Sequence, residues 1–100
     1  MAKMNSEGIV TSVFVSEKYN KCCLKVIFPQ ESTSKHIGSE PESCWFDDLS
    51  VFEKIKSYES DVLYQKTKID FEYITYFSKD GKKLSLKINA IYVNGKNILA

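Results

Sequence analysis

The chain has 100 residues, and its 14 basic side chains, all lysine, are nearly balanced by 13 acidic ones to give a net charge of +1. Arginine grips phosphates and guanine edges through a planar fork, whereas lysine offers only a mobile point charge, so this composition argues against base-specific recognition and against a clamp for a phosphoryl group. With 43% hydrophobic and 27% charged residues, the composition excludes a disordered chain and predicts one domain over residues 1–100.

The N-terminus and the cysteines indicate a cytoplasmic protein. Residues 1–7 lack the apolar segment of a signal peptide, and no apolar run approaches the length of a membrane span. Cys22, Cys23 and Cys44 are odd in number and contain no Cys-x-x-Cys pair. We therefore expect reduced thiols and no metal site.

The first elements in chain order form a predicted β-hairpin. Residues 8–16 are rich in β-branched side chains, and alternate residues from Ile9 to Val15 are expected on one face of a strand. Residues 17–20 form a polar turn, and residues 21–28 form the second strand.

A long loop is expected next, because residues 29–42 contain two prolines and a glycine and show no hydrophobic periodicity. His36 in this segment has no cysteine or aspartate at ligand spacing, so we expect an ordinary exposed side chain. Residues 43–46 predict a short strand that carries Trp45, the only tryptophan.

The period then changes to that of a helix. Leu49, Phe52 and Ile55 recur at every third position, which predicts a short helix over residues 50–58. Ser50 and Glu53 have the spacing of a capping box at its start.

The last third returns to the alternation of β-strands. Residues 66–77 predict a strand with an inward face running from Ile69 to Phe77, and a tight turn at residues 78–81 leads to a strand over residues 83–93. On that strand Leu84 to Tyr92 are expected inward at alternate positions. A second turn at Asn94-Gly95 precedes a short closing strand at residues 97–99.

The first five of these strands, with one helix between the third and the fourth, follow the order of an OB-fold, a small, partly open β-barrel. An open twisted sheet packed by one helix is the alternative. The chain resembles the small OB-fold proteins of bacterial phages and mobile elements that bind single-stranded DNA or assist replication enzymes. The segments that carry this resemblance are the hairpin 8–28, the helix 50–58 and the hairpin around 78–81. Its bias toward Lys, Asn, Ile and Tyr would suit a staphylococcal element.

The resemblance implies a role in DNA replication or recombination, either by binding single-stranded DNA without sequence preference or as a subunit of a polymerase, primase or helicase. OB-folds bind single strands with aromatic rings that stack on bases and lysines that follow the backbone. The candidate nucleic-acid-binding residues are Trp45, Lys66, Lys68, Tyr76, Lys82, Lys83 and Lys87.

Four further apolar residues are expected on the outer face of the sheet, where they would bind a protein partner: Ile27, Ile74, Ile91 and Val93. An adaptor or anti-host protein that binds a partner and no nucleic acid is the alternative function. No phosphate-binding loop, paired catalytic carboxylates or nucleophile–base pair is found in the sequence, so neither enzymatic activity nor a cofactor is expected.

Overall fold

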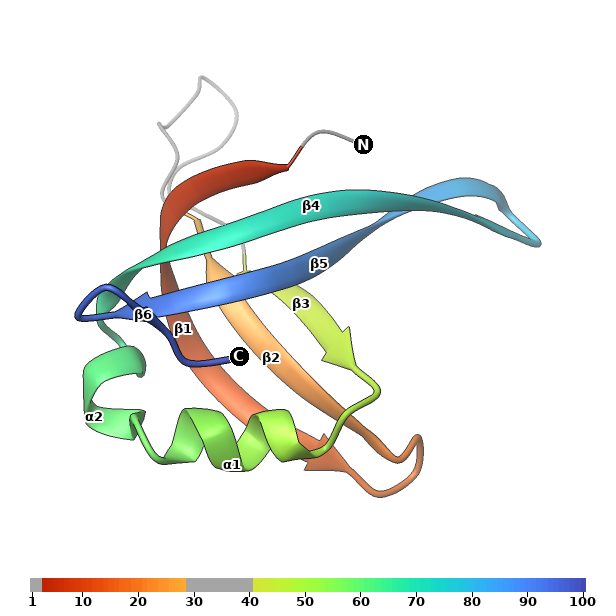
Figure 1. Cartoon of the computed structure of the whole chain (residues 1–100). Helices are drawn as coiled ribbons and strands as arrows, with labels where there is room; N and C mark the ends of the chain where they lie inside the picture. Colours follow the sequence, from red (N-terminus) through yellow and green to blue (C-terminus); the bar gives the residue numbers. More distant parts are fainter. Residues whose placement is uncertain (1–2, 29–40) are drawn as a thin grey trace.

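A computed structural model describes residues 3–28 and 41–100 (Figure 1). The predicted loop 29–42 lies outside the described residues except for its last two positions, which already belong to a strand. The elements in chain order are β1 (Met4–Ser16), β2 (Lys21–Ile27), β3 (Pro41–Phe46), α1 (Ser50–Lys56), α2 (Glu59–Val62), β4 (Lys66–Ser78), β5 (Gly81–Val93) and β6 (Lys96–Asn97).

The strands form one antiparallel sheet in the order β3-β2-β1-β4-β5-β6. β1 belongs to both halves of this sheet, because its first half pairs with β4 and its second half with β2. A bulge at Thr11 interrupts the pairing with β2, and Figure 1 shows the strand curving strongly on its way between the two halves. Such curvature is the usual effect of a bulge.

The sheet is nearly closed on itself at the β3 and β5 sides. Cys44 on β3 lies beside the backbone of Ile88 on β5. Nearby, the Tyr73 hydroxyl on β4 donates a hydrogen bond of 2.7 Å to Glu42 on β3. β3 and β5 are not paired as neighbours in the described residues, so the structure is a mainly β, six-stranded open sheet rather than the predicted five-stranded barrel.

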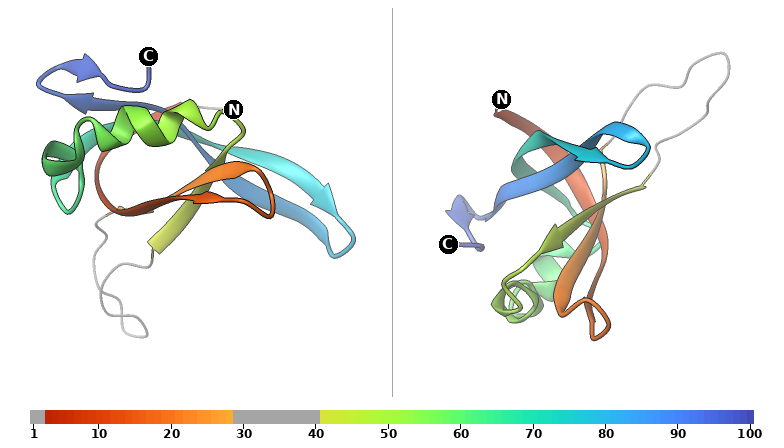
Figure 2. Two further views of the ribbon diagram at one scale, coloured as in Figure 1. Left: turned by 90° about the horizontal axis from the view of Figure 1, so that it is seen from below. Right: turned by 90° about the vertical axis from the view of Figure 1, so that its right-hand side faces the viewer.

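The core lies inside this curved sheet and is covered at one end by the helices (Figures 1 and 2). Leu24, Ile69 and Ile91 are among its fully buried side chains, and Val51 and Ile55 of α1 pack against it. None of the helices in the described part of the chain is long and apolar enough to cross a membrane.

The predicted helix is present, but the expected capping box is wrong. The helix begins at Ser50 with Leu49 as its N-cap, which makes no side-chain capping bond. Asp48 instead accepts a hydrogen bond of 2.9 Å from the Ser50 amide, and the hydrogen bonds from Ser50 lower the pKa of the Asp48 carboxyl. The helical region ends in a second short turn, α2, that the sequence pattern did not predict.

A bulge in β5 overturns the predicted orientation of three residues, because Tyr92, expected inward, bonds to Asp70 on the outer side of the sheet while Ile91 and Val93 change to the inner side. Asp70 pairs with Ala90 and Phe71 pairs with Ile88, so Asn89 is an extra residue in β5. The bulge reverses the alternation after Ile88 and turns Ile91 and Val93 into the core, where they are 0% and 8% exposed. The prediction that these two residues lie on an outer apolar stripe is therefore wrong.

The far end of the β4–β5 hairpin, residues 72–87, projects beyond the rest of the sheet as a two-stranded arm, which Figure 1 shows at the right. Phe77 and Leu84 were expected to face the core, but in this arm they are 82% and 63% exposed. Both tight turns predicted from the sequence are present, with positive φ at Gly81, Asn94 and Gly95.

Candidate nucleic-acid interface

An aromatic cluster covers the outer face of β1, β2 and β3. Phe14, Cys23 and Trp45 stand side by side on the three strands, because Cys23 pairs with both of the others. The Trp45 ring meets Phe14 edge to face at 6.1 Å between ring centroids and meets Tyr19 in the same way at 6.0 Å. The three rings are 40–58% exposed, whereas Cys23 beside them is 1% exposed.

This cluster forms one side of a groove of about 580 Å³, lined by Tyr19, Lys21, Trp45, Tyr76 and Ser85. Tyr19 comes from the turn between β1 and β2, and Lys21 is the first residue of β2, whereas Tyr76 and Ser85 come from the projecting arm. Figures 1 and 2 show the tips of the two hairpins on the same side of the molecule. The groove therefore lies across β3 between two hairpins, with exposed aromatic side chains on both of its sides.

Lysines border this groove from both hairpins. Lys21 lines it, and its Nζ lies 3.1 Å from Asp47 Oδ1. Lys83 stands directly across from Tyr76 on β5, and its Nζ lies 3.7 Å from Asp80 at the tip of the arm. These ion pairs are largely exposed to solvent, so little free energy is needed to exchange either carboxylate for a phosphate.

The structure brings together Trp45, Tyr76 and Lys83 of the seven residues predicted to bind nucleic acid. Lys82 is also on the arm, but it stands across from Phe77 and so faces the opposite side from Tyr76. The Nζ of Lys87 lies 3.9 Å from Glu72 Oε1, so the Glu72 carboxylate partly neutralises the charge of this lysine.

Lys66 and Lys68 lie elsewhere. They line a separate open hollow of about 830 Å³ together with Glu7, Asp70 and Tyr92. Lys68 and Tyr76 share a face of β4 but are eight residues apart, which is about 26 Å along a strand. In the hollow, Asp70 accepts hydrogen bonds from Tyr92 and Asn5, and these bonds lower the pKa of its carboxyl. An acidic side chain at this position disfavours a phosphate.

Of the residues predicted to bind a partner, Ile27 and Ile74 keep outward positions. Ile74 is 40% exposed on the arm, and Ile27 is half-buried beside Ile9. With Ile91 and Val93 in the core, these two do not form a continuous apolar stripe.

Sequence reasoning missed Tyr19 and Lys21 as parts of the groove. The segment 17–20 was interpreted only as a polar turn, and a single exposed aromatic residue such as Tyr19 is too common on protein surfaces to indicate a contact surface from the sequence alone. Phe14, whose ring packs on Trp45, extends the same aromatic surface.

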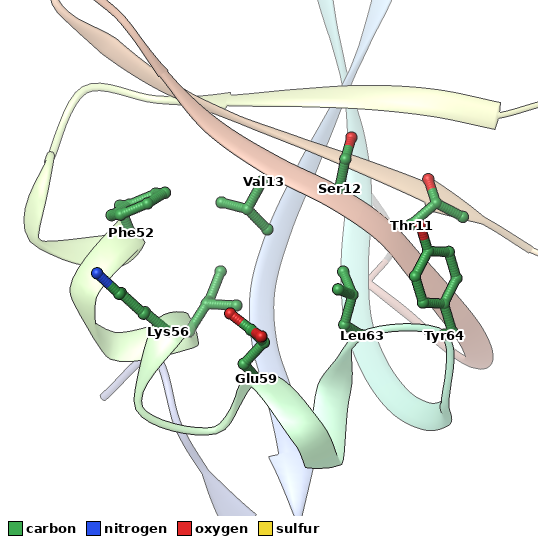
Figure 3. Close-up of a pocket in the computed structure, with 9 residues that line it drawn as sticks. Thr11, Ser12, Val13, Phe52, Lys56, Glu59, Leu63 and Tyr64 are labelled. Atoms are coloured by element: carbon green, nitrogen blue, oxygen red, sulfur yellow. The ribbon is translucent and has the colours of Figure 1, made fainter.

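A third, smaller cavity of about 350 Å³ lies between the bulged part of β1 and the helices (Figure 3). Phe52, Leu63 and Tyr64 line it together with an oppositely charged pair of side chains, Lys56 and Glu59. Tyr64 has a positive φ of 60°, and its amide donates a hydrogen bond of 2.8 Å to Val10. The cavity shares no lining residue with the groove.

The thiols are free and buried. Burial raises the pKa of Cys22 and Cys23 and raises that of Cys44 to about 11, so all three are thiols rather than nucleophilic thiolates at neutral pH. Within residues 3–28 and 41–100, no three His, Cys, Asp or Glu side chains are grouped so that they could hold a metal ion.

The comparisons with known proteins agree with this geometry at the level of the fold. No family model and no curated protein matches the chain. Among solved structures, the chain is similar to a small single-stranded DNA binding protein from Mycoplasma pneumoniae, with a TM-score of 0.59, 15% sequence identity and 97% of each chain covered. At this identity the similarity shows a shared fold over nearly the whole chain.

Proposed function

We propose that this protein binds single-stranded DNA without sequence preference in the groove between the β1–β2 turn and the β4–β5 arm. The observation that carries the proposal is the placement of exposed Tyr19, Trp45 and Tyr76 around one groove with Lys21. Stacked aromatic rings and mobile lysines are the means by which OB-type domains hold single strands. The fold shared with a small single-stranded DNA binding protein adds support.

In this proposal, bases stack on the rings and phosphates replace the carboxylates that now face the lysines. Trp45 is already held by edge-to-face contacts with Phe14 and Tyr19, so little ordering is needed before a base stacks on it. Lys21 leaves Asp47 to meet a phosphate, and Lys83 leaves Asp80 in the same way. The chain has no arginine, the residue best suited to two-pronged contacts with guanine edges, and stacking on aromatic rings accepts every base, so binding without sequence preference is expected.

The net charge of +1 sets the expected strength of binding. With no strong overall field to attract the strand, affinity comes from stacking and from a few local lysine contacts, so it is modest and sensitive to salt. We further propose that the protein is a non-enzymatic accessory of DNA replication or recombination on a mobile element, as its sequence resemblance implies.

A second candidate function is that of a subunit that binds a polymerase, primase or helicase. The observation that favours it is Ile74, an aliphatic side chain 40% exposed on the arm next to the groove. Such a subunit would contribute DNA contacts only within the complex. It has less support than direct binding, because Ile91 and Val93 are buried.

Fluorescence anisotropy of a labelled thymine oligomer, titrated with the protein at low and at physiological salt, tests the proposal. Saturable binding that weakens as salt increases is the expected result. Absence of binding even at low salt would contradict direct DNA binding and would leave the protein-partner functions, including an adaptor that needs no nucleic acid.

A further inference from the structure

The projecting arm leaves one edge of β4 without a partner in the described residues. β4 pairs with β1 only as far as Phe71, which stands across from Met4, whereas its pairing with β5 continues to Ser78. Within residues 3–28 and 41–100, residues 72–78 therefore have no strand beside them on the β1 side, over an edge about 23 Å long. A two-stranded ribbon of this kind is at best marginally stable in water without further contacts.

The two edges of the arm differ in the protection that natural proteins use against strand pairing. β5 carries Lys82, Lys83 and Lys87, and charged side chains, lysine above all, discourage edge-to-edge association. Residues 73–78 of β4 read Tyr-Ile-Thr-Tyr-Phe-Ser, with high β-propensity and no charge. The β4 edge is thus suited to pairing with another strand, and the β5 edge is not.

We propose that residues 72–78 of β4 pair antiparallel with the same residues of a second copy of this chain, with Thr75 on the two-fold axis. In the β4–β5 hairpin, Ser78 and Gly81 close a two-residue turn, so the backbone groups of Tyr73, Thr75 and Phe77 point to the free edge. These are the residues that meet in a pairing centred on Thr75.

This register fits the side chains as well as the backbone. Phe77, which is 82% exposed, comes to lie across from Tyr73 of the second copy and is covered there. Glu72, the charged residue of the segment, lies across from Ser78, so no like charges face each other. The tip of each arm carries Lys79, Lys82 and Lys83 against the single acidic Asp80, and it approaches the acidic Glu72 end of the other strand, so the charges of the two copies are complementary.

The assembly does not depend on nucleic acid, and it leaves the groove open. Tyr76 stays on the groove side of the arm, where Ile74 of the second copy would lie beside it. The four-stranded ribbon formed by the two arms would join the two grooves into one longer surface.

A charge-swap experiment tests the register. Thr75→Glu and Thr75→Lys each place two like charges across from each other on the two-fold axis, whereas a mixture of the two variants places opposite charges there. Sedimentation velocity without DNA should show a dimer for the wild type, association weakened about tenfold or more for each variant alone, and a dimer again for the equimolar mixture. Ser60→Glu on the exposed part of α2 is the matched control and should dimerise as the wild type does.

Three outcomes would contradict the proposal. The first is a wild type that is monomeric at every concentration. The second is dimerisation of both Thr75 variants as strong as that of the wild type, which would place the interface elsewhere. The third is a mixture that stays monomeric although circular dichroism shows both variants to be folded. None of these measurements includes DNA. Dimerisation through β4 can therefore be disproved without contradicting DNA binding in the groove, and DNA binding can be disproved without contradicting dimerisation.

Discussion

Trp45 is the residue on which the proposed function depends most. It contacts Phe14 on one side and Tyr19 on the other, it is 45% exposed, and it lines the groove. A large exposed ring that is fixed in place and borders a hollow is suited to stacking on a planar ligand, and each base in single-stranded DNA presents such a plane.

Trp45→Ala should therefore weaken binding of a thymine oligomer by about 1–3 kcal/mol, or roughly 5- to 150-fold in Kd, because one base loses its stacking partner. Anisotropy titrations at fixed salt measure this change. Tyr64→Ala removes a ring that is 69% exposed but lies outside the groove, so its Kd should equal that of the wild type. Equal losses in the two variants would show that the groove is not the binding surface.

Gly8 is a residue at which space, rather than backbone conformation, excludes a side chain. A Cβ at this position would lie 2.8 Å from Ile69 Cδ1 and 3.1 Å from the Phe28 ring. The Phe28 ring is itself packed on Phe71, with 4.4 Å between ring centroids, and has little room to yield.

We expect Gly8→Ala to lower the free energy of unfolding by about 1–3 kcal/mol, as overpacking of a core does. Urea denaturation followed by circular dichroism measures the loss. Unchanged stability would mean that Ile69 and Phe28 shift without cost and that the contact between β1 and β4 is loosely packed at this point.

At the scale of elements, the tip of the β1–β2 hairpin and the β4–β5 arm act together, because each contributes an aromatic ring and a lysine to the groove or its border. Tyr19 and Lys21 come from the first, and Tyr76 and Lys83 from the second. The other end of β4, with Lys66 and Lys68, lies about 26 Å from Tyr76 and carries acidic neighbours. The lysines of the chain are thus expected to differ in their contribution to binding.

The dependence of binding on salt distinguishes the two groups of lysines. If Lys21 and Lys83 each meet one phosphate, the double variant Lys21→Gln/Lys83→Gln should flatten the slope of log K against log salt by about 1.4, at about 0.7 per contact on single strands. The matched double variant Lys66→Gln/Lys68→Gln removes the same charge and should leave the slope unchanged. The opposite result would move the path of the strand to the hollow beside Asp70.

The hydrogen bond from Tyr73 to Glu42 joins β4 to β3 where the sheet nearly closes, and it gives stability a dependence on pH. Burial and the nearby Glu42 carboxylate raise the pKa of Tyr73 from 10.0 to about 12. The folded state therefore favours the neutral phenol. This contribution to stability is complete below pH 10 and is lost as the pH increases through 12.

In Tyr73→Phe this contribution is absent, so the difference in free energy of unfolding between wild type and variant should shrink from pH 10 to pH 12. Denaturant titrations at a series of pH values measure it, and deprotonation of lysines affects both proteins alike. A difference that stays constant over this range would contradict the coupling of Tyr73 to Glu42.

At the scale of the whole molecule, the sequence pattern predicted the order of the elements but not the curvature of the sheet. The alternation from Ile69 to Tyr73 identified the inward face of β4, because no extra residue interrupts that strand. The bulges at Thr11 and Asn89 each add one residue to a strand. A single added residue leaves no sign in the pattern of residue types along a strand, so the inward positions of Ile91 and Val93 could not be predicted.

The candidate site was likewise predictable from the sequence in part only. Trp45 and Tyr76 were selected from the sequence as exposed aromatic residues, and both line the groove. That Tyr19 joins them depends on how far the β1–β2 turn projects beside β3, a property of the curved sheet that no local pattern encodes. Similarly, Lys66 and Lys68 lie on the same face of β4 as Tyr76 but do not line the groove, because β4 is long enough to connect opposite ends of the molecule.

The central claim, that bases stack on Trp45 in the groove, is tested most directly by the intrinsic fluorescence of the protein. Trp45 is the single tryptophan of the chain, so its emission reports on this one position. Titration with an unlabelled thymine oligomer at low salt should quench the emission to saturation, and added salt should restore it. Emission unchanged by the oligomer, under conditions in which anisotropy shows binding, would contradict stacking on Trp45 and would place the strand on another surface.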